Sequence, residues 1–293
     1  MESNVTENPA AIAGWREKWP APAKLNLMLK ITGRRADGYH LLQTVFQIID
    51  LCDWLTFHPL SEDKVCLQEQ IPGVAETDEL TVRAAKLLKQ HTGYAGGVRI
   101  ELEKNLPMGG GLGGGSSDAA TTLVVLNRLW DLRLSQQQLM QLGLQLGADV
   151  PIFVFGHSAW GEGVGEELQA ITLPEYWLLI IKPDCHVNTR QIFLAEGLTR
   201  NSASIKMIDF IAGDYSNDCT AIVTSMYPEV KNAIRALSEF GEARLTGTGA
   251  CVFAVFVDEN AARAAYAALQ SEWVVYLARG QNQSPLYKKL DRE

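Results

Sequence analysis

Cysteine is sparse in this 293-residue chain, and its five cysteines form no C-x-x-C pair. An odd, scattered set predicts free thiols in a reducing compartment rather than a disulfide framework. The five histidines show no metal-ligand spacing either, so we expect no protein-bound metal site. The cysteines are Cys52, Cys66, Cys185, Cys219 and Cys251.

Basic charge and long apolar runs are also scarce. Lys and Arg number 26 against 34 Asp and Glu, a net charge of −8, which disfavours a nucleic-acid partner because such proteins are normally basic. No apolar stretch approaches the ~20 residues that span a bilayer, so we expect no membrane partner. The polar residues 1–19 lack the apolar core of a secretory signal and are predicted to form a mobile N-terminal extension. These features predict a cytoplasmic protein.

Glycine, by contrast, is concentrated in one place. Residues 109–115 read Gly-Gly-Gly-Leu-Gly-Gly-Gly, and Ser116, Ser117 and Asp118 follow. Glycine costs backbone entropy on folding, so the run is better explained by close approach of the backbone to a ligand. A strand pattern over 98–103 precedes the run, and a helix pattern over 116–131 follows it. A strand, a loop of free amides and a helix N-terminus together suit a phosphate.

Two other nucleotide motifs fit this run less well. Gly109, Gly111 and Gly114 match G-x-G-x-x-G, but a dinucleotide fold needs a second parallel strand where this sequence predicts a helix over 135–146. A Walker A loop needs a Lys-Ser or Lys-Thr pair after the glycines, and none follows. An NAD-dependent oxidoreductase, a non-catalytic nucleotide-binding module and a merely flexible turn remain as alternatives.

Three polar features outside the run add to the phosphate loop. Lys24 and Asn26 share one face of a strand predicted over 23–31, a face that alternation alone would assign to solvent. Asp149 lies in an apolar segment, where a carboxylate is costly to bury unless it is paired, although an Asx turn before a proline explains it equally well. Thr246-Gly-Thr-Gly-Ala250 would on its own favour a hairpin turn. Together they are the parts of a phosphoryl-transfer site.

The remaining periodicity predicts strands that cluster instead of alternating with helices, which indicates an α+β fold. Further strands are predicted over 43–50, 54–58, 177–181, 243–246, 251–257 and 273–279. Further helices are predicted over 78–91, 189–196, 204–212, 219–226, 229–239 and 260–270.

Seven short stretches, in order along the chain, resemble the GHMP kinases, which bind ATP through a glycine-rich loop unlike Walker A. Pro22–Leu27, Pro107–Ala120 and Leu245–Cys251 are similar to the three motifs of that family, and residues 35–40, 146–151, 162–166 and 216–218 carry the rest. The resemblance implies an α+β fold with two domains. These are an ATP-binding domain like ribosomal protein S5 domain 2 over 20–175 and a ferredoxin-like substrate domain over 176–293.

The resemblance is greatest to the members that act on a small-molecule substrate with a cytidine diphosphate group. It implies ATP-dependent phosphorylation of the 2-hydroxyl of the methylerythritol moiety, in the non-mevalonate isoprenoid pathway. ATP would be the co-substrate, accompanied by Mg²⁺, and the protein would be a monomer or weak homodimer. The nearest alternative is another GHMP kinase, for homoserine, mevalonate or a sugar.

The resemblance also implies roles for individual residues, with Asp149 as catalytic base and Lys24 as its partner. The ATP-binding residues would be Pro107, Met108, Gly109, Gly110, Gly111, Leu112, Gly113, Gly114, Gly115, Ser116 and Ser117 around the phosphates, Leu80 and Lys104 near the adenosine, and Thr248 near the phosphates. The substrate-binding residues would be Asn26, Tyr39, His40, Val164, Thr189 and Phe193, with Tyr39 and His40 at the cytosine. Asp118 is expected to cap the helix after the glycines, with Mg²⁺ binding as its alternative.

Overall fold

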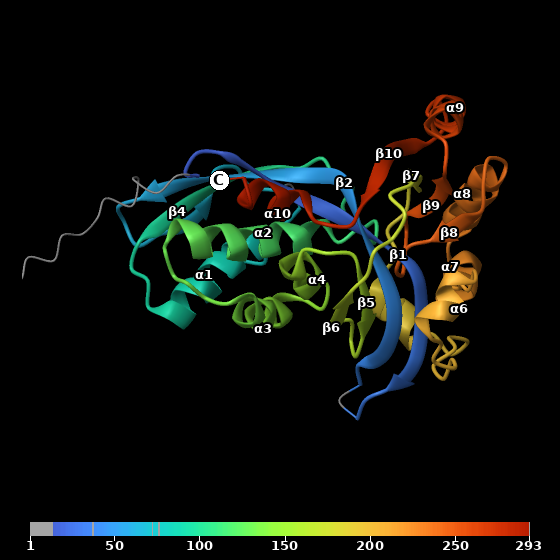
Figure 1. The fold of residues 1–293 in the computed structure, drawn as a ribbon, viewed down its shortest axis with the longest axis horizontal. Helices are drawn as coiled ribbons and strands as arrows, with labels where there is room; N and C mark the ends of the chain where they lie inside the picture. Colours follow the sequence, from blue (N-terminus) through green and yellow to red (C-terminus); the bar gives the residue numbers. More distant parts are fainter. Residues whose placement is uncertain (1–13, 37, 72, 76, 293) are drawn as a thin grey trace, which may run out of the picture.

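A long antiparallel hairpin runs through the middle of the molecule and connects its two lobes (Figure 1). The computed structural model describes residues 14–36, 38–71, 73–75 and 77–292. The hairpin consists of β1 (Lys18–Arg34) and β2 (His40–Leu60). The strands predicted over 43–50 and 54–58 are therefore one strand. Its apolar pattern is broken by Asp53, but this carboxylate is fully buried and accepts hydrogen bonds from the backbone N–H groups of Asn105 and Leu106.

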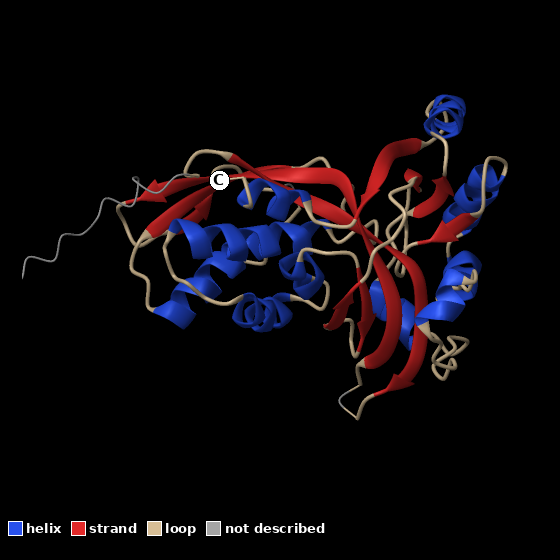
Figure 2. Ribbon diagram, viewed as in Figure 1, coloured by secondary structure: helices blue, strands red, loops and turns tan. Residues whose placement is uncertain are grey.

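The first lobe packs helices against one face of the sheet formed by β1, β2 and their neighbours (Figure 2). The strands beside the hairpin are β3 (Val65–Leu67), β4 (Gly97–Glu103), β5 (Ala159–Glu162) and β6 (Glu167–Ala170). The helices are α1 (Leu80–Thr92), α2 (Gly114–Leu129), α3 (Gln136–Leu146) and α4 (Val150–Phe155). Their core contains Phe57, Leu88 and Leu123, all without solvent exposure.

The second lobe is an antiparallel sheet in the order β10-β7-β9-β8, with helices gathered beside it (Figure 1). Its strands are β7 (Trp177–Lys182), β8 (Ala243–Leu245), β9 (Val252–Phe256) and β10 (Val274–Gln281). Its helices are α5 (Thr189–Leu194), α6 (Met207–Ile211), α7 (Thr220–Met226), α8 (Pro228–Ser238) and α9 (Glu259–Leu269). Leu29 and Ile31 of β1 belong to the core of this lobe.

The chain crosses between the lobes more than once. The end of β10 pairs with β2, where Gly280 lies opposite Ile49. The last helix, α10 (Pro285–Leu290), then returns to the first lobe, where Leu286 is buried in the core. The domain boundary predicted near residue 176 stays a prediction, but a cut there would separate α10 from the core that it completes.

Several sequence expectations change once the tertiary contacts are known. Residues 1–13 of the predicted extension lie outside the described residues, whereas Trp19, predicted as its end, is fully buried in the first core. The face of β1 that carries Lys24 and Asn26 is buried too, because other parts of the protein cover both faces of this strand. A bulge between Asn26 and Met28 also interrupts the alternation of its side chains between the two faces. The short elements β3, β5, β6, α4 and α10 were not predicted, since each is too short to give a clear period.

Candidate active site

The predicted phosphate loop forms the wall of a cavity of about 450 Å³. Residues 107–116 line it together with Leu80 and Lys104, so nearly all the predicted ATP-binding positions lie around one space. Two predicted positions do not line it. Thr248 lines a neighbouring cavity instead. Ser117 is fully buried, and its hydroxyl has no hydrogen-bond partner in the described part of the chain. Glu79 also lines the cavity, and its carboxylate caps α1 by accepting from the N–H groups of Thr81 and Val82.

The second glycine loop packs directly on the first. It joins the antiparallel strands β8 and β9, so the hairpin turn predicted there is present. The N–H of Cys251 donates to the carbonyl of Gly110 over 3.0 Å. A Cβ atom on Gly111 would lie only 2.9 Å from the carbonyl oxygens of Thr246 and Gly249, which explains why this position has no side chain. The hairpin does not exclude the functional interpretation, because the turn also lines a cavity with Gly247 and Thr248; a role of this loop in binding phosphate or substrate stays a prediction.

Lys24 and Asp149 meet beside these loops, although 124 positions separate them. The Lys24 ammonium lies 3.3 Å from a carboxylate oxygen of Asp149. The two side chains are unequally exposed: Lys24 is 3% exposed and Asp149 40%. Asp149 is the residue before α4, yet its side chain makes no capping hydrogen bond. The Asx-turn interpretation is therefore wrong, and the carboxylate is left facing both Lys24 and solvent.

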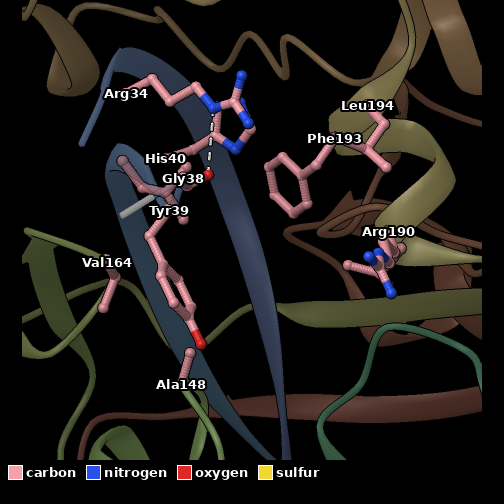
Figure 3. A pocket seen from close by; sticks show the side chains of 11 residues that line it. Arg34, Gly38, Tyr39, His40, Ala148, Val164, Arg190, Phe193 and Leu194 are labelled. Atoms are coloured by element: carbon pink, nitrogen blue, oxygen red, sulfur yellow. Dashed lines mark hydrogen bonds between the residues drawn. The ribbon is translucent and has the colours of Figure 1, made fainter. Parts of the chain in front are cut away.

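A second cavity, of about 590 Å³, is lined by five of the six residues predicted to bind the substrate, all except Asn26 (Figure 3). Figure 3 shows Tyr39 on one side of it and Phe193 and Arg190 on the other, with Val164 to the left of the Tyr39 ring and Ala148 below it. The ring of His40 stacks on Phe193, with centroids 5.0 Å apart and planes inclined by 21°. Arg34 and Arg190, which sequence reasoning missed, bring positive charge to this cavity. Their only sequence signal was adjacency to the predicted positions 35–40 and Thr189.

The protonation state of His40 is set by its surroundings. Nε of Arg200 donates to Nε2 of His40 over 3.2 Å, so this ring nitrogen carries no proton. Burial lowers the pKa of His40 below its usual value, and the charges of Arg200 and Arg34 lower it further. A neutral ring with its proton on Nδ1 follows, and this N–H is a donor suited to an acceptor atom on a base.

A smaller cavity of about 290 Å³ connects the two ends of the site. It shares Gly111, Ser116 and Asp149 with the glycine-loop cavity. It shares Val164, Thr189 and Phe193 with the cavity that contains Tyr39. Lys24, Asn26 and Thr248 line it as well, and the Thr248 hydroxyl is hydrogen-bonded to that of Thr189. A phosphate donor at one end and an acceptor at the other would therefore meet at Lys24 and Asp149.

Lys104 forms a buried ionic cluster at the base of the glycine loop. Its ammonium bonds to carboxylate oxygens of both Asp53 and Asp118. Burial opposes the charge on Lys104, but Asp118 and Asp53 together raise its pKa above the usual value. Asp118 lies beyond the first turn of α2 and makes no capping bond, so the predicted cap is wrong. The burial of Asp118 raises its pKa well above the usual range, although Lys104 opposes this shift.

The donor set around the loop can accommodate a nucleotide-bound Mg²⁺. Within residues 14–36, 38–71, 73–75 and 77–292, no group of three or more His, Cys, Asp or Glu residues could hold a metal ion by itself. Mg²⁺ normally uses one or two carboxylates together with water and the phosphates of its nucleotide. Asp118 and Asp149 both line the cavity, and Oδ1 of Asp118 is buried without a partner among the described residues. The residues present therefore fit such an ion.

No helix in the described ranges is long and apolar enough to cross a membrane. The five cysteines are all free thiols, as predicted. Burial raises the pKa of Cys52, Cys219 and Cys251 to about 12 in each case. None of these thiols is therefore available as a thiolate nucleophile near neutral pH.

Named relatives cover almost the whole chain. A 4-diphosphocytidyl-2-C-methyl-D-erythritol kinase of Methylococcus capsulatus is 55% identical over 291 residues, covering 99% of this chain and 98% of the relative. The kinase of the same name from Nitrosococcus oceani is 52% identical and covers 94% and 98%. A crystal structure of 4-(cytidine 5'-diphospho)-2C-methyl-D-erythritol kinase has a TM-score of 0.80 at 32% identity, covering 90% of this chain and 99% of that one.

The fold alone is shared more widely. A mevalonate kinase structure has a TM-score of 0.69 at 15% identity, covering 91% of this chain and all of that one. In this chain, α2 is followed by two helices and then by β5, which is antiparallel to β2, so the described fold is not a dinucleotide-binding one. The family model of the GHMP kinase N-terminal domain matches residues 79–157, and that of the C-terminal domain matches residues 196–275. With the two-domain α+β fold and the glycine loop in place, the chain belongs to the GHMP kinase family, whose members use ATP to phosphorylate small molecules.

Proposed function

We propose that this chain transfers the γ-phosphoryl group of ATP to the 2-hydroxyl of 4-diphosphocytidyl-2-C-methyl-D-erythritol. The observation that carries the proposal is the position of the Lys24–Asp149 pair, at the junction between the glycine-loop cavity and the cavity lined by Tyr39, His40 and Phe193. The names of the relatives at 55% and 52% identity support the same substrate.

The chemistry needs positioning and charge neutralisation more than covalent catalysis. The acceptor oxygen forms a bond to the γ-phosphorus, the bond between that phosphorus and the bridging oxygen breaks, and ADP leaves. Asp149 receives the proton of the attacking hydroxyl. Its partial exposure lets the acceptor reach it, while the buried ammonium of Lys24, 3.3 Å away, orients the carboxylate.

The phosphates would lie against the backbone amides of residues 109–115 and the N-terminus of α2. Asp118 and Asp149, with the Ser116 hydroxyl, would contact a Mg²⁺ carried by the nucleotide. Such an ion would neutralise charge on the transferring group. Leu80 and Lys104 would border the adenosine.

At the other end, Phe193 and Tyr39 offer aromatic faces for a pyrimidine, and His40 offers a neutral N–H donor. Arg34 and Arg190 would face the diphosphate. The proposed roles need no residue from a second copy of the chain, and we propose a monomer or weak homodimer. Free thiols and the use of ATP favour a cytoplasmic location.

The experiment is an ADP-release assay with the purified chain, ATP, Mg²⁺ and a panel of alcohols. The panel contains the cytidylylated methylerythritol, the same alcohol without its cytidine diphosphate group, homoserine, mevalonate and galactose. We expect turnover only with the first compound, and phosphorus NMR should place the new phosphate on its 2-hydroxyl. Faster turnover with homoserine, mevalonate or galactose would replace the proposal by another small-molecule kinase.

A further inference from the structure

A chain of buried hydrogen bonds leads from Lys24 away from the reacting groups. The Lys24 ammonium donates to Oδ1 of Asn26 over 2.7 Å. Nδ2 of Asn26 donates to the hydroxyl of Thr44 over 2.9 Å, and that hydroxyl donates to the carbonyl of Met28 over 2.6 Å. Thr44 is fully buried, and Asn26 is 5% exposed. Water is therefore largely excluded from competing for these groups.

The direction of each bond follows from the inventory of donors and acceptors. A hydroxyl has one hydrogen, and a carbonyl can only accept. The Thr44 hydroxyl therefore donates its hydrogen to the carbonyl of Met28. What Thr44 presents to Asn26 is then a lone pair, which only the NH₂ end of the amide can satisfy. The oxygen end of the amide is thereby turned toward Lys24, whose ammonium has donors only.

The opposite orientation of the amide would lose both contacts at once. Its NH₂ group would face the ammonium of Lys24, and its oxygen would face the lone pair of Thr44. Buried polar groups without partners are costly, so the alternative is strongly disfavoured while the Thr44 hydroxyl is present. The main chain of Asn26 is fixed as well, because its N–H donates to the hydroxyl of Thr246 over 2.9 Å. Rotation of the side-chain amide is thus the remaining freedom, and Thr44 removes it.

We propose that Thr44 is a positioning residue for phosphoryl transfer, acting through Asn26 to hold the Lys24 ammonium against Asp149. The inference rests on the proposed function, in which Lys24 and Asp149 meet the acceptor hydroxyl. Lys24 has a flexible four-carbon stem, and its 3.3 Å contact with the partly exposed Asp149 is longer than its 2.7 Å bond to Asn26. Asn26 is therefore the firmer of the two contacts, and Thr44 decides which end of that amide Lys24 meets.

The test is a set of variants assayed with the cytidylylated methylerythritol. Thr44→Val removes the hydroxyl but keeps the shape, and it should lower kcat about tenfold or more while leaving the KM for ATP nearly unchanged. Thr44→Ser restores the hydroxyl and should restore most of kcat. Thr121→Val is the matched control, since Thr121 is equally buried and its hydroxyl also bonds a backbone carbonyl, that of Pro20, but outside the Lys24 chain. It should keep kcat even if its melting temperature falls as much as that of Thr44→Val.

A double-mutant cycle separates positioning from simple destabilisation. If Thr44 acts only through Asn26, then Asn26→Ala with Thr44→Val should be no slower than Asn26→Ala alone. Wild-type kcat in Thr44→Val, or multiplied losses in the double variant, would overturn the inference. Thr44→Ala replaces Thr44→Val in each comparison if the valine variant does not fold.

A readout without substrate keeps the inference distinct from the proposed function. The side-chain NH₂ of Asn26 should exchange its hydrogens slowly by NMR in wild type and Thr44→Ser, and faster in Thr44→Val. Equal exchange in all three would overturn the role of Thr44 even in an active enzyme. If the wild type does not phosphorylate the acceptor, the proposed function fails, and the exchange rates still decide whether Thr44 holds the amide.

Discussion

The phosphate end and the base end of the site are built from different parts of the chain. At the phosphate end, the backbones of two glycine loops lie against each other, and the main side chain between them, Lys24, is 3% exposed. At the base end, side chains form the walls, and Tyr39 and Leu194 are 62% and 57% exposed. Backbone amides recognise any phosphate, whereas aromatic and cationic side chains distinguish one acceptor from another.

Because of this difference, substitutions at the two ends should affect different kinetic constants. Changes at the buried end should act on kcat or on nucleotide binding, because in the proposed function the groups there would touch the transferred phosphoryl. Changes at the exposed end should act on the KM for the acceptor, because in the proposed function those groups would touch the part of the substrate that does not react. The comparison fails if variants at the two ends give the same kinetic pattern.

The largest effect is expected from the Lys24–Asp149 pair. Asp149→Asn and Lys24→Met should each lower kcat by about 10²-fold or more, the scale of acid–base contributions, while ATP still binds. Lys30→Met is the matched control, because Lys30 lies on the same strand and pairs with Asp214 over 3.0 Å, away from the site. Steady-state kinetics with nucleotide titration measure all three. Near-wild-type turnover in Asp149→Asn, or a loss in Lys30→Met as large as in Lys24→Met, would contradict the assignment.

A smaller but still large effect should distinguish two glycines of the same run. Gly111 has φ +77°, and a side chain there would press on the carbonyls of Thr246 and Gly249. A left-handed conformation costs a non-glycine residue roughly 1–2 kcal/mol, and the close contacts add to this cost. Gly111→Ala should therefore lower both the melting temperature and the affinity for a fluorescent ATP analogue.

Gly115 is the comparison, since it lies in the first turn of α2 and an added Cβ would make an ordinary 3.5 Å contact with Leu80. Alanine is a better helix former than glycine by about 1 kcal/mol, so Gly115→Ala should keep or raise the melting temperature. Equal losses in both variants would mean that the loop tolerates bulk nowhere, and that the packing of the two loops is not what makes Gly111 necessary.

Features that depend on residues close together in the sequence could be predicted, and features that depend on distant residues could not. The glycine loop, its preceding strand and its following helix are local, and residue pattern alone predicted all three. The residue types of Lys24 and Asp149 suggested that both belong to one phosphoryl-transfer site, but only the family resemblance predicted that they contact each other. Local alternation even assigned Lys24 to a solvent face, because it contains no information about what packs on that face.

Asp118 and Asp53 show the same limit for charged residues. Asp118 follows two serines near a helix start, so a cap was the natural local interpretation, yet its carboxylate turns to Lys104. Asp53 broke a strand pattern in the sequence but is buried with the same lysine. In both cases a partner distant along the chain decided the outcome, and propensity rules do not include such partners.

At the base end, removal of the Phe193 ring should change binding more than turnover. Stacking of a base on an aromatic side chain is worth about 1–3 kcal/mol, so Phe193→Leu should raise the acceptor KM about tenfold with little change in kcat. Leu194→Ala is the control, because Leu194 borders the same cavity without an aromatic face. Measurements with the cytidylylated acceptor and saturating ATP would reveal the split. A fall in kcat with an unchanged KM would contradict the division between the two ends.

The smallest expected effect is a pH dependence carried by His40. Its pKa is lowered, so the ring is neutral at pH 7 and gains a proton only as the pH falls below the usual value of 6.5. Protonation would remove the acceptor for Arg200 and place a cation beside two arginines. The acceptor KM should therefore be constant above neutral pH and rise a few-fold as the solution is acidified.

Arg200→Met tests this explanation without altering the ring. Loss of the Arg200 charge should bring the pKa of His40 back toward its usual value, so the rise in KM should begin at a higher pH. Acidification should also destabilise the fold. The unfolded chain binds a proton on this ring more readily than the folded chain does, so the free energy of unfolding should fall as the pH drops through 6.5. A KM profile that keeps its midpoint in Arg200→Met would assign the titration to a group other than His40.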